Sequence, residues 1–207
     1  MVTIIDFIIH LDKYLGLIFQ NYGNLTYIII FLIIFLETGF VLTPFLPGDS
    51  LIFVVGTLAA KGSLNIALLM VLLSFAAIAG DTVNYLVGNY FGERVFSKSR
   101  FFKQEYLERT KEFYKKHGRK TIILARFIPV IRTFAPFVAG IGKMRYKEFL
   151  TFNILGGISW VALFLLSGYF FGEIPIVKDN LALVILLIIL ASFIPPIFEF
   201  IKNKKRS

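Results

Sequence analysis

The chain has 207 residues, of which 57% are hydrophobic and 17% charged, and its mean hydropathy is +0.77. A soluble domain of this size carries more charge and shorter apolar runs, so the composition indicates an integral membrane protein. The sequence contains no cysteine, which excludes disulfides, thiolate nucleophiles and cysteine metal sites. The net charge of +9 does not indicate nucleic-acid binding, because the basic residues lie between apolar segments and at the C-terminus.

The first 23 residues combine apolar side chains with Asp6, His10, Asp12 and Lys13 at roughly helical spacing. This pattern predicts either a helix in the membrane interface over residues 1–23 or a short packed helix. A cleaved signal peptide is not expected, because the stretch lacks a basic start and a small-residue cleavage site.

Six apolar segments follow, and several approach the roughly 18 residues needed to cross a bilayer. They cover residues 25–43, 45–60, 64–91, 121–141, 149–171 and 181–201. No hydrophilic linker is long enough to hold a second fold. We therefore expect a single membrane domain over residues 1–207, whose last transmembrane helix is 181–201.

The distribution of positive charge predicts the topology. Residues 93–120 carry ten Lys or Arg, which favours a cytoplasmic loop. The tail adds Lys202, Lys204, Lys205 and Arg206 and is expected on the same side. Lys143, Arg145 and Lys147 also make the link after residue 141 cytoplasmic. Residues 121–141 must then enter and leave from the cytoplasmic face, as a re-entrant hairpin.

The composition of this segment agrees with a hairpin. Pro129 and Pro136 are expected to break regular helix, and Gly140 to help shape the hairpin. Arg126 and Arg132 are too costly for a lipid-facing span.

The same reasoning predicts a second hairpin in the first half of the chain. Residues 44–60 are too short to span comfortably and are interrupted by Pro47 and Gly48, so they are expected to enter from the outer face. Residues 25–43 then run outward, which puts the N-terminus in the cytoplasm.

Two motifs recur along the chain at a near-constant offset. Gly88-Asn-Tyr-Phe-Gly-Glu93 matches Gly168-Tyr-Phe-Phe-Gly-Glu173, and Phe45-Leu-Pro47 matches Phe127-Ile-Pro129. They predict two repeats, residues 25–92 and 121–173, in opposite orientations. An all-α integral membrane protein with inverted repeats is the usual build of a secondary transporter, although a duplicated scaffold without transport stays open.

Four ionisable residues stand inside apolar sequence: Glu37, Asp49, Arg126 and Arg132. Each needs a partner, water or a proton, and the acids and arginines can neutralise one another if the hairpins face each other. A purely structural set of salt bridges is the rival interpretation, but buried ion pairs stabilise poorly compared with apolar packing. Arginine suits a phosphate cargo because its planar fork donates two parallel hydrogen bonds, and a carboxylate suits proton binding and release.

Asp81 and Asn84 lie three residues apart and share one helical face, so they form a supporting polar patch. Interhelical hydrogen bonding is favoured over a cargo path for this pair. No metal site is expected, because His10 and His117 have no neighbours at ligand spacing. No enzyme motif is present either, and no cofactor is expected.

The arginine-proline stretch Ala125-Arg-Phe-Ile-Pro-Val-Ile-Arg-Thr-Phe-Ala-Pro-Phe-Val-Ala-Gly140 resembles the signature of the DedA family, which is also described by its VTT or SNARE-associated domain. Three further segments agree: Phe35-Leu-Glu-Thr-Gly39, Phe45-Leu-Pro-Gly-Asp-Ser50 and Gly80-Asp-Thr-Val-Asn-Tyr85. The resemblance implies a bacterial inner-membrane protein with two facing re-entrant hairpins. It also implies that Glu37, Asp49, Arg126 and Arg132 form the substrate and proton site.

The resemblance further implies a lipid flippase, sometimes dependent on the proton motive force. Undecaprenyl phosphate is the first expected cargo, and phosphatidylethanolamine the second. A proton-coupled antiporter of small cations or drugs and a non-transporting envelope scaffold are the alternatives. The sequence leaves a homo-oligomer open.

Overall fold

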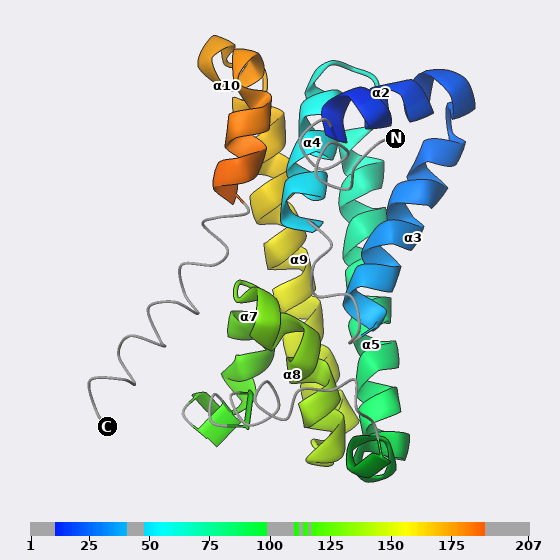
Figure 1. Cartoon of the computed structure of the whole chain (residues 1–207), viewed down its shortest axis with the longest axis vertical. Helices are drawn as coiled ribbons and strands as arrows, with labels where there is room; N and C mark the ends of the chain where they lie inside the picture. The colour runs from blue at the N-terminus through cyan, green and yellow to red at the C-terminus, as the bar shows by residue number, and fades with distance from the viewer. Residues whose placement is uncertain (1–10, 41–47, 99–109, 112–113, 116, 189–207) are drawn as a thin grey trace, which may run out of the picture. The chain divides into compact units, whose positions relative to one another are not determined.

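The computed structural model describes residues 11–40, 48–98, 110–111, 114–115 and 117–188, and all regular structure in these ranges is helical (Figure 1). The elements are α2 (Leu11–Tyr22), α3 (Leu25–Gly39), α4 (Gly48–Ala60), α5 (Ile66–Lys98), η1 (Gly118–Lys120), α7 (Thr121–Ala125), α8 (Pro129–Ile141), α9 (Tyr146–Phe171) and α10 (Pro175–Asp179). Residues 181–188 are also helical. The all-α class predicted from the sequence is confirmed.

Among the described residues, two helices are long and apolar enough to cross a membrane: Ile66–Tyr90 within α5, of 25 residues, and the whole of α9, of 26. At 1.5 Å per residue, each exceeds the ~30 Å thickness of a hydrocarbon core. Large apolar side chains on both helices face outward, and Val71, Phe75 and Phe170 are each more than 60% exposed. Exposed apolar surface of this kind is typical of lipid contact.

The charged stretch after the first long helix differs from the loop predicted over residues 93–120. Helix α5 continues through it to Lys98, and η1 forms at its other end. Charge indicates the side of the membrane on which a segment lies, but Glu, Lys and Arg are good helix formers and do not themselves end a helix.

Local signals explain where several helices begin. The Asn65 side chain accepts a hydrogen bond from the Leu68 main-chain N–H at 3.0 Å and so caps the first turn of α5. Helix α8 begins at Pro129 after Ile128 in extended conformation, the favoured place for a proline. The expectation that Pro136 also breaks the helix was wrong, because α8 continues through it to Ile141. Proline removes one main-chain donor, and α8 tolerates that loss within otherwise buried surroundings.

The chain forms two compact units. The first comprises Met1–Leu32, Pro47–Leu73 and Trp160–Ser207, and the second Ile33–Leu46 and Ser74–Ser159. Helices α3, α5 and α9 contribute residues to both units.

In the first unit α4 is the buried helix, and all its residues from Ser50 to Ala59 are buried. It packs against α2 and against the C-terminal part of α9. The contact with α9 requires glycine on both sides. A Cβ on Gly56 would meet the main chain at Leu165 and Gly168, and a Cβ on Gly168 would meet the main chain at Phe53.

The second unit contains a matching contact between α8 and α5. A Cβ on Gly140 would meet the main chain at Tyr85 and Gly88, and a Cβ on Gly88 would meet the main chain at Phe137. The glycines of the short helices are at positions 56 and 140, which are 84 apart, and those of the long helices are at positions 88 and 168, which are 80 apart. In each unit a short apolar helix from one half of the sequence therefore packs on the long helix of the other half.

Several predicted features fall wholly or partly outside the described residues. These are residues 1–10 of the expected N-terminal helix, Pro47, most of the basic loop between 99 and 116, and residues 189–201 of the last expected transmembrane helix. The described part of the N-terminal stretch is α2, which buries Leu15.

Candidate functional site

Arg132, on the second turn of α8, forms a buried ion pair with Glu37 on the last turn of α3. Its Nη2 donates to Glu37 Oε1 at 2.5 Å. The Glu37 side chain is 1% exposed and that of Arg132 6%. The pair joins the first predicted acid to one of the two predicted arginines.

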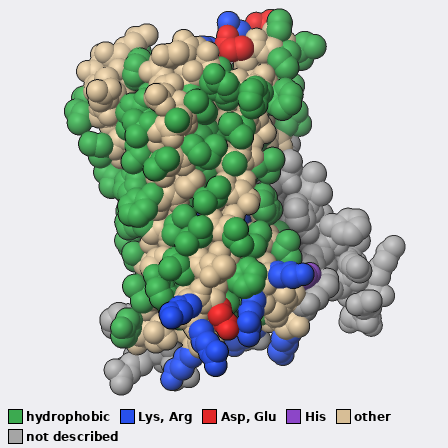
Figure 2. Space-filling model, turned by 180° about the vertical axis from the view of Figure 1, so that it is seen from behind, with side chains coloured by type: hydrophobic (Ala, Val, Ile, Leu, Met, Phe, Trp, Pro, Cys, Tyr) green, Lys and Arg blue, Asp and Glu red, His purple; other side chains and the backbone are tan. Residues whose placement is uncertain are grey.

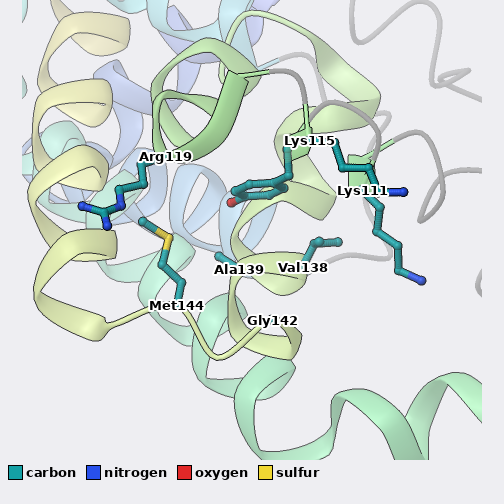
Figure 3. A pocket seen from close by; sticks show the side chains of 8 residues that line it. Lys111, Lys115, Arg119, Val138, Ala139, Gly142 and Met144 are labelled. Carbon is teal, nitrogen blue, oxygen red and sulfur yellow. The ribbon is translucent and has the colours of Figure 1, made fainter.

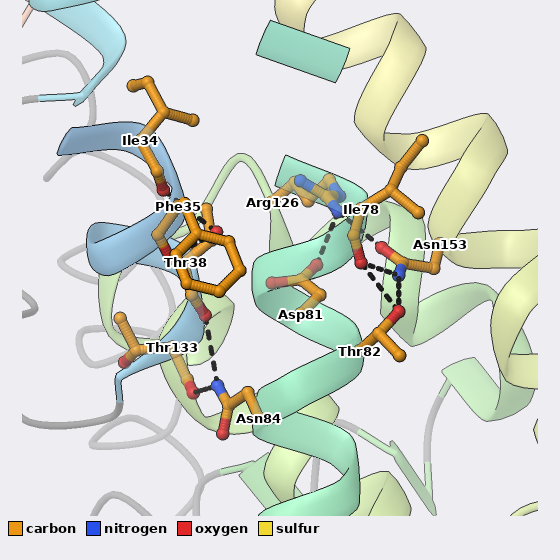
Figure 4. Close-up of polar contacts among 10 residues, drawn as sticks. All are labelled: Ile34, Phe35, Thr38, Ile78, Asp81, Thr82, Asn84, Arg126, Thr133 and Asn153. Atoms are coloured by element: carbon orange, nitrogen blue, oxygen red, sulfur yellow. Dashed lines mark hydrogen bonds and ion pairs between the residues drawn. The ribbon is translucent and has the colours of Figure 1, made fainter. Parts of the chain in front are cut away.

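Arg126 lies at the three-residue break between α7 and α8 and pairs with Asp81 of α5. Its Nη2 donates at 2.5 Å both to Asp81 Oδ2 and to Asn153 Oδ1 of α9 (Figure 4). Asn153 in turn donates from Nδ2 to the Ile78 carbonyl at 3.0 Å and lies 3.4 Å from the Thr82 hydroxyl. Arg126 is thereby held by two helices at once, α5 and α9.

Small residues in α9 make room for the Arg126 side chain. A Cβ on Gly156 would lie 3.1 Å from Arg126 Cδ and 3.2 Å from its Nε. A Cβ on Gly157 would lie 3.5 Å from Arg126 Nη2. The Gly156 contacts are close and surround a side chain that is 1% exposed, so Gly156 sets the space that the Arg126 side chain occupies. The Gly157 distance is an ordinary van der Waals contact.

Asn84 lies one turn beyond Asp81 on α5 and ties α8 to α3. Its Nδ2 donates to the Thr133 carbonyl at 2.9 Å and lies 3.4 Å from the Thr38 carbonyl (Figure 4). The amide is fully buried, and its Oδ1 has no hydrogen-bond partner among the described residues. Asn84 therefore fixes the main chain beside Arg132.

The two ion pairs form one electrostatic cluster, because the charge of Arg132 acts on Asp81 and on Arg126 as well as on Glu37. Two guanidinium and two carboxylate groups balance one another within the second unit. In surroundings of low dielectric constant, each charge depends on its partner.

Asp49 belongs to the first unit, at the start of α4. Its Oδ1 accepts a hydrogen bond from the Trp160 Nε1–H at 2.9 Å, and the indole is fully buried. The residues grouped from the sequence are thus divided: Glu37, Arg126 and Arg132 lie in one unit and Asp49 in the other.

Sequence reasoning assigned Asp81 to a polar patch but did not identify it as the partner of Arg126. It also missed Asn153 and the contact made by Trp160. Asn84 was singled out because it shares a helical face with Asp81, whereas Asn153 has no charged residue three or four positions away. A polar residue alone in an apolar segment is the signal that could have found Asn153. The described residues contain no cluster of three or more potential metal ligands.

The arrangement can bind an anion after rearrangement. Each guanidinium is planar and can donate two parallel hydrogen bonds to a carboxylate or to a phosphate. Protonation of the partner carboxylate would leave these donors available to a phosphate. Apolar helices able to cross a membrane, with arginine–carboxylate pairs buried among them, define a membrane protein with an internal polar site.

Comparison with known proteins gives the family. The VTT domain matches residues 46–170, more than half of the chain. Protein DedA of Escherichia coli K12 is 53% identical over 206 residues, covering 98% of this chain and 94% of that protein. The chain belongs to the DedA family of VTT-domain membrane proteins.

More distant relatives carry names that place them in membranes. An uncharacterized membrane protein of Mycobacterium leprae is 47% identical over 79% of this chain and 74% of its own length. Inner membrane protein YqjA of E. coli K12 is 34% identical over 74% of this chain and 70% of its own length. No solved structure matches the chain.

Proposed function

We propose that this protein is a lipid translocase that carries the phosphate headgroup of undecaprenyl phosphate, or of a phospholipid, across the bacterial inner membrane. The observation that carries the proposal is the pairing of two buried arginines with two buried carboxylates in one unit. Desolvated arginine forks suit a phosphate, and carboxylates that compete for the same forks give a way to release it.

The transport step is an exchange of partners at Arg132. While Glu37 is ionised it occupies the guanidinium. Protonation of Glu37 removes its charge, and the guanidinium then binds a phosphate through two parallel hydrogen bonds. Loss of the proton restores the carboxylate, which displaces the phosphate. Proton binding and headgroup release are thereby linked, and this is how a proton gradient would drive transport.

Arg126 plays the second part in this scheme. Asp81 and Asn153 hold its guanidinium from two helices, and Gly156 and Gly157 leave room around it. Its position at the break between α7 and α8 puts a fixed positive charge beside a site that must accept a negative headgroup.

The fold proposed for this function is an inverted repeat with two re-entrant hairpins. The matching glycine contacts of α4 on α9 and of α8 on α5 support it, as does the break between α7 and α8. The basic residues around η1 and before α9 favour a cytoplasmic position for that end, and the basic tail favours a cytoplasmic C-terminus.

The test is flipping in reconstituted liposomes with labelled undecaprenyl phosphate and labelled phosphatidylethanolamine. Wild type should accelerate one of the two lipids, and Arg132→Ala should not. Arg145→Ala is the matched control, since Arg145 is exposed and lies outside the site. If neither lipid moves under any pH gradient, lipid translocation is wrong and proton-coupled cation flux is the next activity to measure.

A further inference from the structure

A pocket of about 380 Å³ lies within the second unit, and none of its lining residues belongs to the two ion pairs. Its walls combine the end of α8 with the stretch before η1 (Figure 3). It is lined by Lys111, Tyr114, Lys115, Arg119, Val138, Ala139, Gly142 and Met144.

The pocket has a cationic rim and an apolar wall. Lys111, Lys115 and Arg119 supply three positive charges, and Lys115 and Arg119 are exposed. Arg119 Nε also lies 3.2 Å from Glu148 Oε2, which offsets part of one charge. Val138, Ala139 and Met144 line the apolar side (Figure 3), and Tyr114 is a further lining residue.

Tyr114 is fixed between these two sides. Its hydroxyl donates to the Ala135 carbonyl of α8 at 2.9 Å. Burial raises the pKa of the Tyr114 hydroxyl above its ordinary value, so it remains a neutral donor. The wall of the pocket therefore keeps its form and carries no charge of its own.

The pocket lies where the apolar part of the chain begins. Met144 lies two residues before Tyr146, where α9 begins. Helix α9 is long and apolar enough to cross the membrane. Figure 2 shows Lys and Arg side chains gathered in one group directly beside a surface of hydrophobic side chains. A ligand bound here meets charge at one end and apolar surface at the other.

We propose that this pocket binds the headgroup of an anionic phospholipid, with its phosphate at Lys111 and Lys115 and its first acyl carbons against Val138 and Met144. Charge complementarity and the adjoining apolar wall select this occupant. A small soluble anion would use only the rim, and a neutral lipid only the wall. Basic groups at a membrane surface attract acidic lipids by about 1 kcal/mol each. The site is separate from the arginine–carboxylate cluster and does not depend on which lipid is moved.

The test measures lipid binding to the full-length protein in a neutral detergent, by native mass spectrometry and by titration. The probes are dioleoyl phosphatidylglycerol, dioleoyl phosphatidylcholine and inorganic phosphate. Phosphatidylglycerol should bind at least ten times more tightly than phosphatidylcholine. Lys111→Gln combined with Lys115→Gln should lower the affinity for phosphatidylglycerol about thirtyfold, which corresponds to about 2 kcal/mol.

The matched control removes the same charge elsewhere on this unit. Lys120 and Lys147 are exposed and do not line the pocket, so Lys120→Gln combined with Lys147→Gln should change the affinity less than threefold. Gly142→Asp adds an acidic side chain at the pocket, and the main-chain conformation there is open to any residue (φ −72°). This variant should lower the affinity for phosphatidylglycerol at least tenfold.

Three results would overturn the proposal. If the two double variants lost the same affinity for phosphatidylglycerol, the lipid would be attracted by surface charge in general and not bound in this pocket. Equal binding of the two lipids would mean an unselective apolar groove. Displacement of the lipid by millimolar inorganic phosphate would mean a site for a soluble anion.

Discussion

Arg132 Nη2 and Glu37 Oε1 lie 2.5 Å apart although 95 positions separate the two residues in the chain. The contact joins the end of α3 to the first half of α8 without exposure to solvent. Two charges removed from water have a desolvation cost that their attraction barely offsets, so the pair contributes little stability compared with apolar side chains. Removal of one partner has a different effect, because it strands the other charge.

The first prediction follows from that asymmetry. Glu37→Gln should destabilise the protein by about 3–5 kcal/mol, because it removes the carboxylate that directly compensates the buried Arg132 guanidinium. Adding Arg132→Gln should restore most of that loss. Thermal unfolding of the purified protein in detergent measures both variants. A double variant as unstable as the single one would mean that Glu37 acts through some other contact.

An exposed pair provides the control for this experiment. Lys178 Nζ lies 3.1 Å from Glu173 Oε2, with 53% and 37% of the two side chains exposed. Glu173→Gln should therefore change the stability by at most about 1 kcal/mol.

The second prediction separates charge from geometry at the arginines. Arg126→Lys and Arg132→Lys keep the positive charge but lose the fork that makes two parallel hydrogen bonds, so each should lower lipid flipping at least tenfold. Arg145→Lys, on the exposed link before α9, should flip lipid at the wild-type rate. Wild-type transport by both site variants would rule out the phosphate clamp.

Hydropathy predicted the long helices closely, because a membrane-spanning helix is continuous in sequence. Residues 64–91 and 149–171 were expected, and the apolar helices cover Ile66–Tyr90 and Tyr146–Phe171. Helix α3 ends at Gly39, earlier than the expected residue 43. The apolar signal continues past Gly39, so hydropathy cannot locate that end.

The sequence indicated three of the four charges in the cluster, Glu37, Arg126 and Arg132, but not the pairing of Arg126 with Asp81. Buried charges in apolar sequence must find partners, which pointed correctly to Glu37 and Arg132. Arg126 pairs with Asp81, 45 positions earlier in the chain, because α5 packs beside the break between α7 and α8. No local spacing encodes that contact. The partner of Asp49 was hidden for another reason: an indole N–H is a weak signal in a helix as apolar as α9.

The third prediction tests what Asp49 does. Asp49→Asn keeps an oxygen that can accept from the Trp160 indole but removes the charge. Trp160→Phe removes the hydrogen bond and keeps the charge. If Asp49 takes part in proton-linked transport, Asp49→Asn should lower flipping at least tenfold while Trp160→Phe lowers it less than threefold. The reverse order would make Asp49 a positioning residue for the indole.

The fourth prediction concerns the glycines that let the short helices approach the long ones. A methyl group at Gly56 would press on the main chain of α9, and one at Gly140 on that of α5. Neither obstacle is a flexible side chain, so the helices must separate. Gly56→Ala and Gly140→Ala should each destabilise the protein by about 1–3 kcal/mol or more.

Gly142→Ala is the control for both glycine variants. Its Cβ would lie 3.3 Å from the Val138 carbonyl oxygen, with no other heavy atom closer, and its φ of −72° suits any residue. The melting temperature should therefore fall less for Gly142→Ala than for Gly56→Ala and Gly140→Ala, which should lower it by similar amounts. Similar losses are expected because both glycines make the same kind of contact, each with the long helix of the opposite half. A large loss at one position and none at the other would argue against two equivalent repeats.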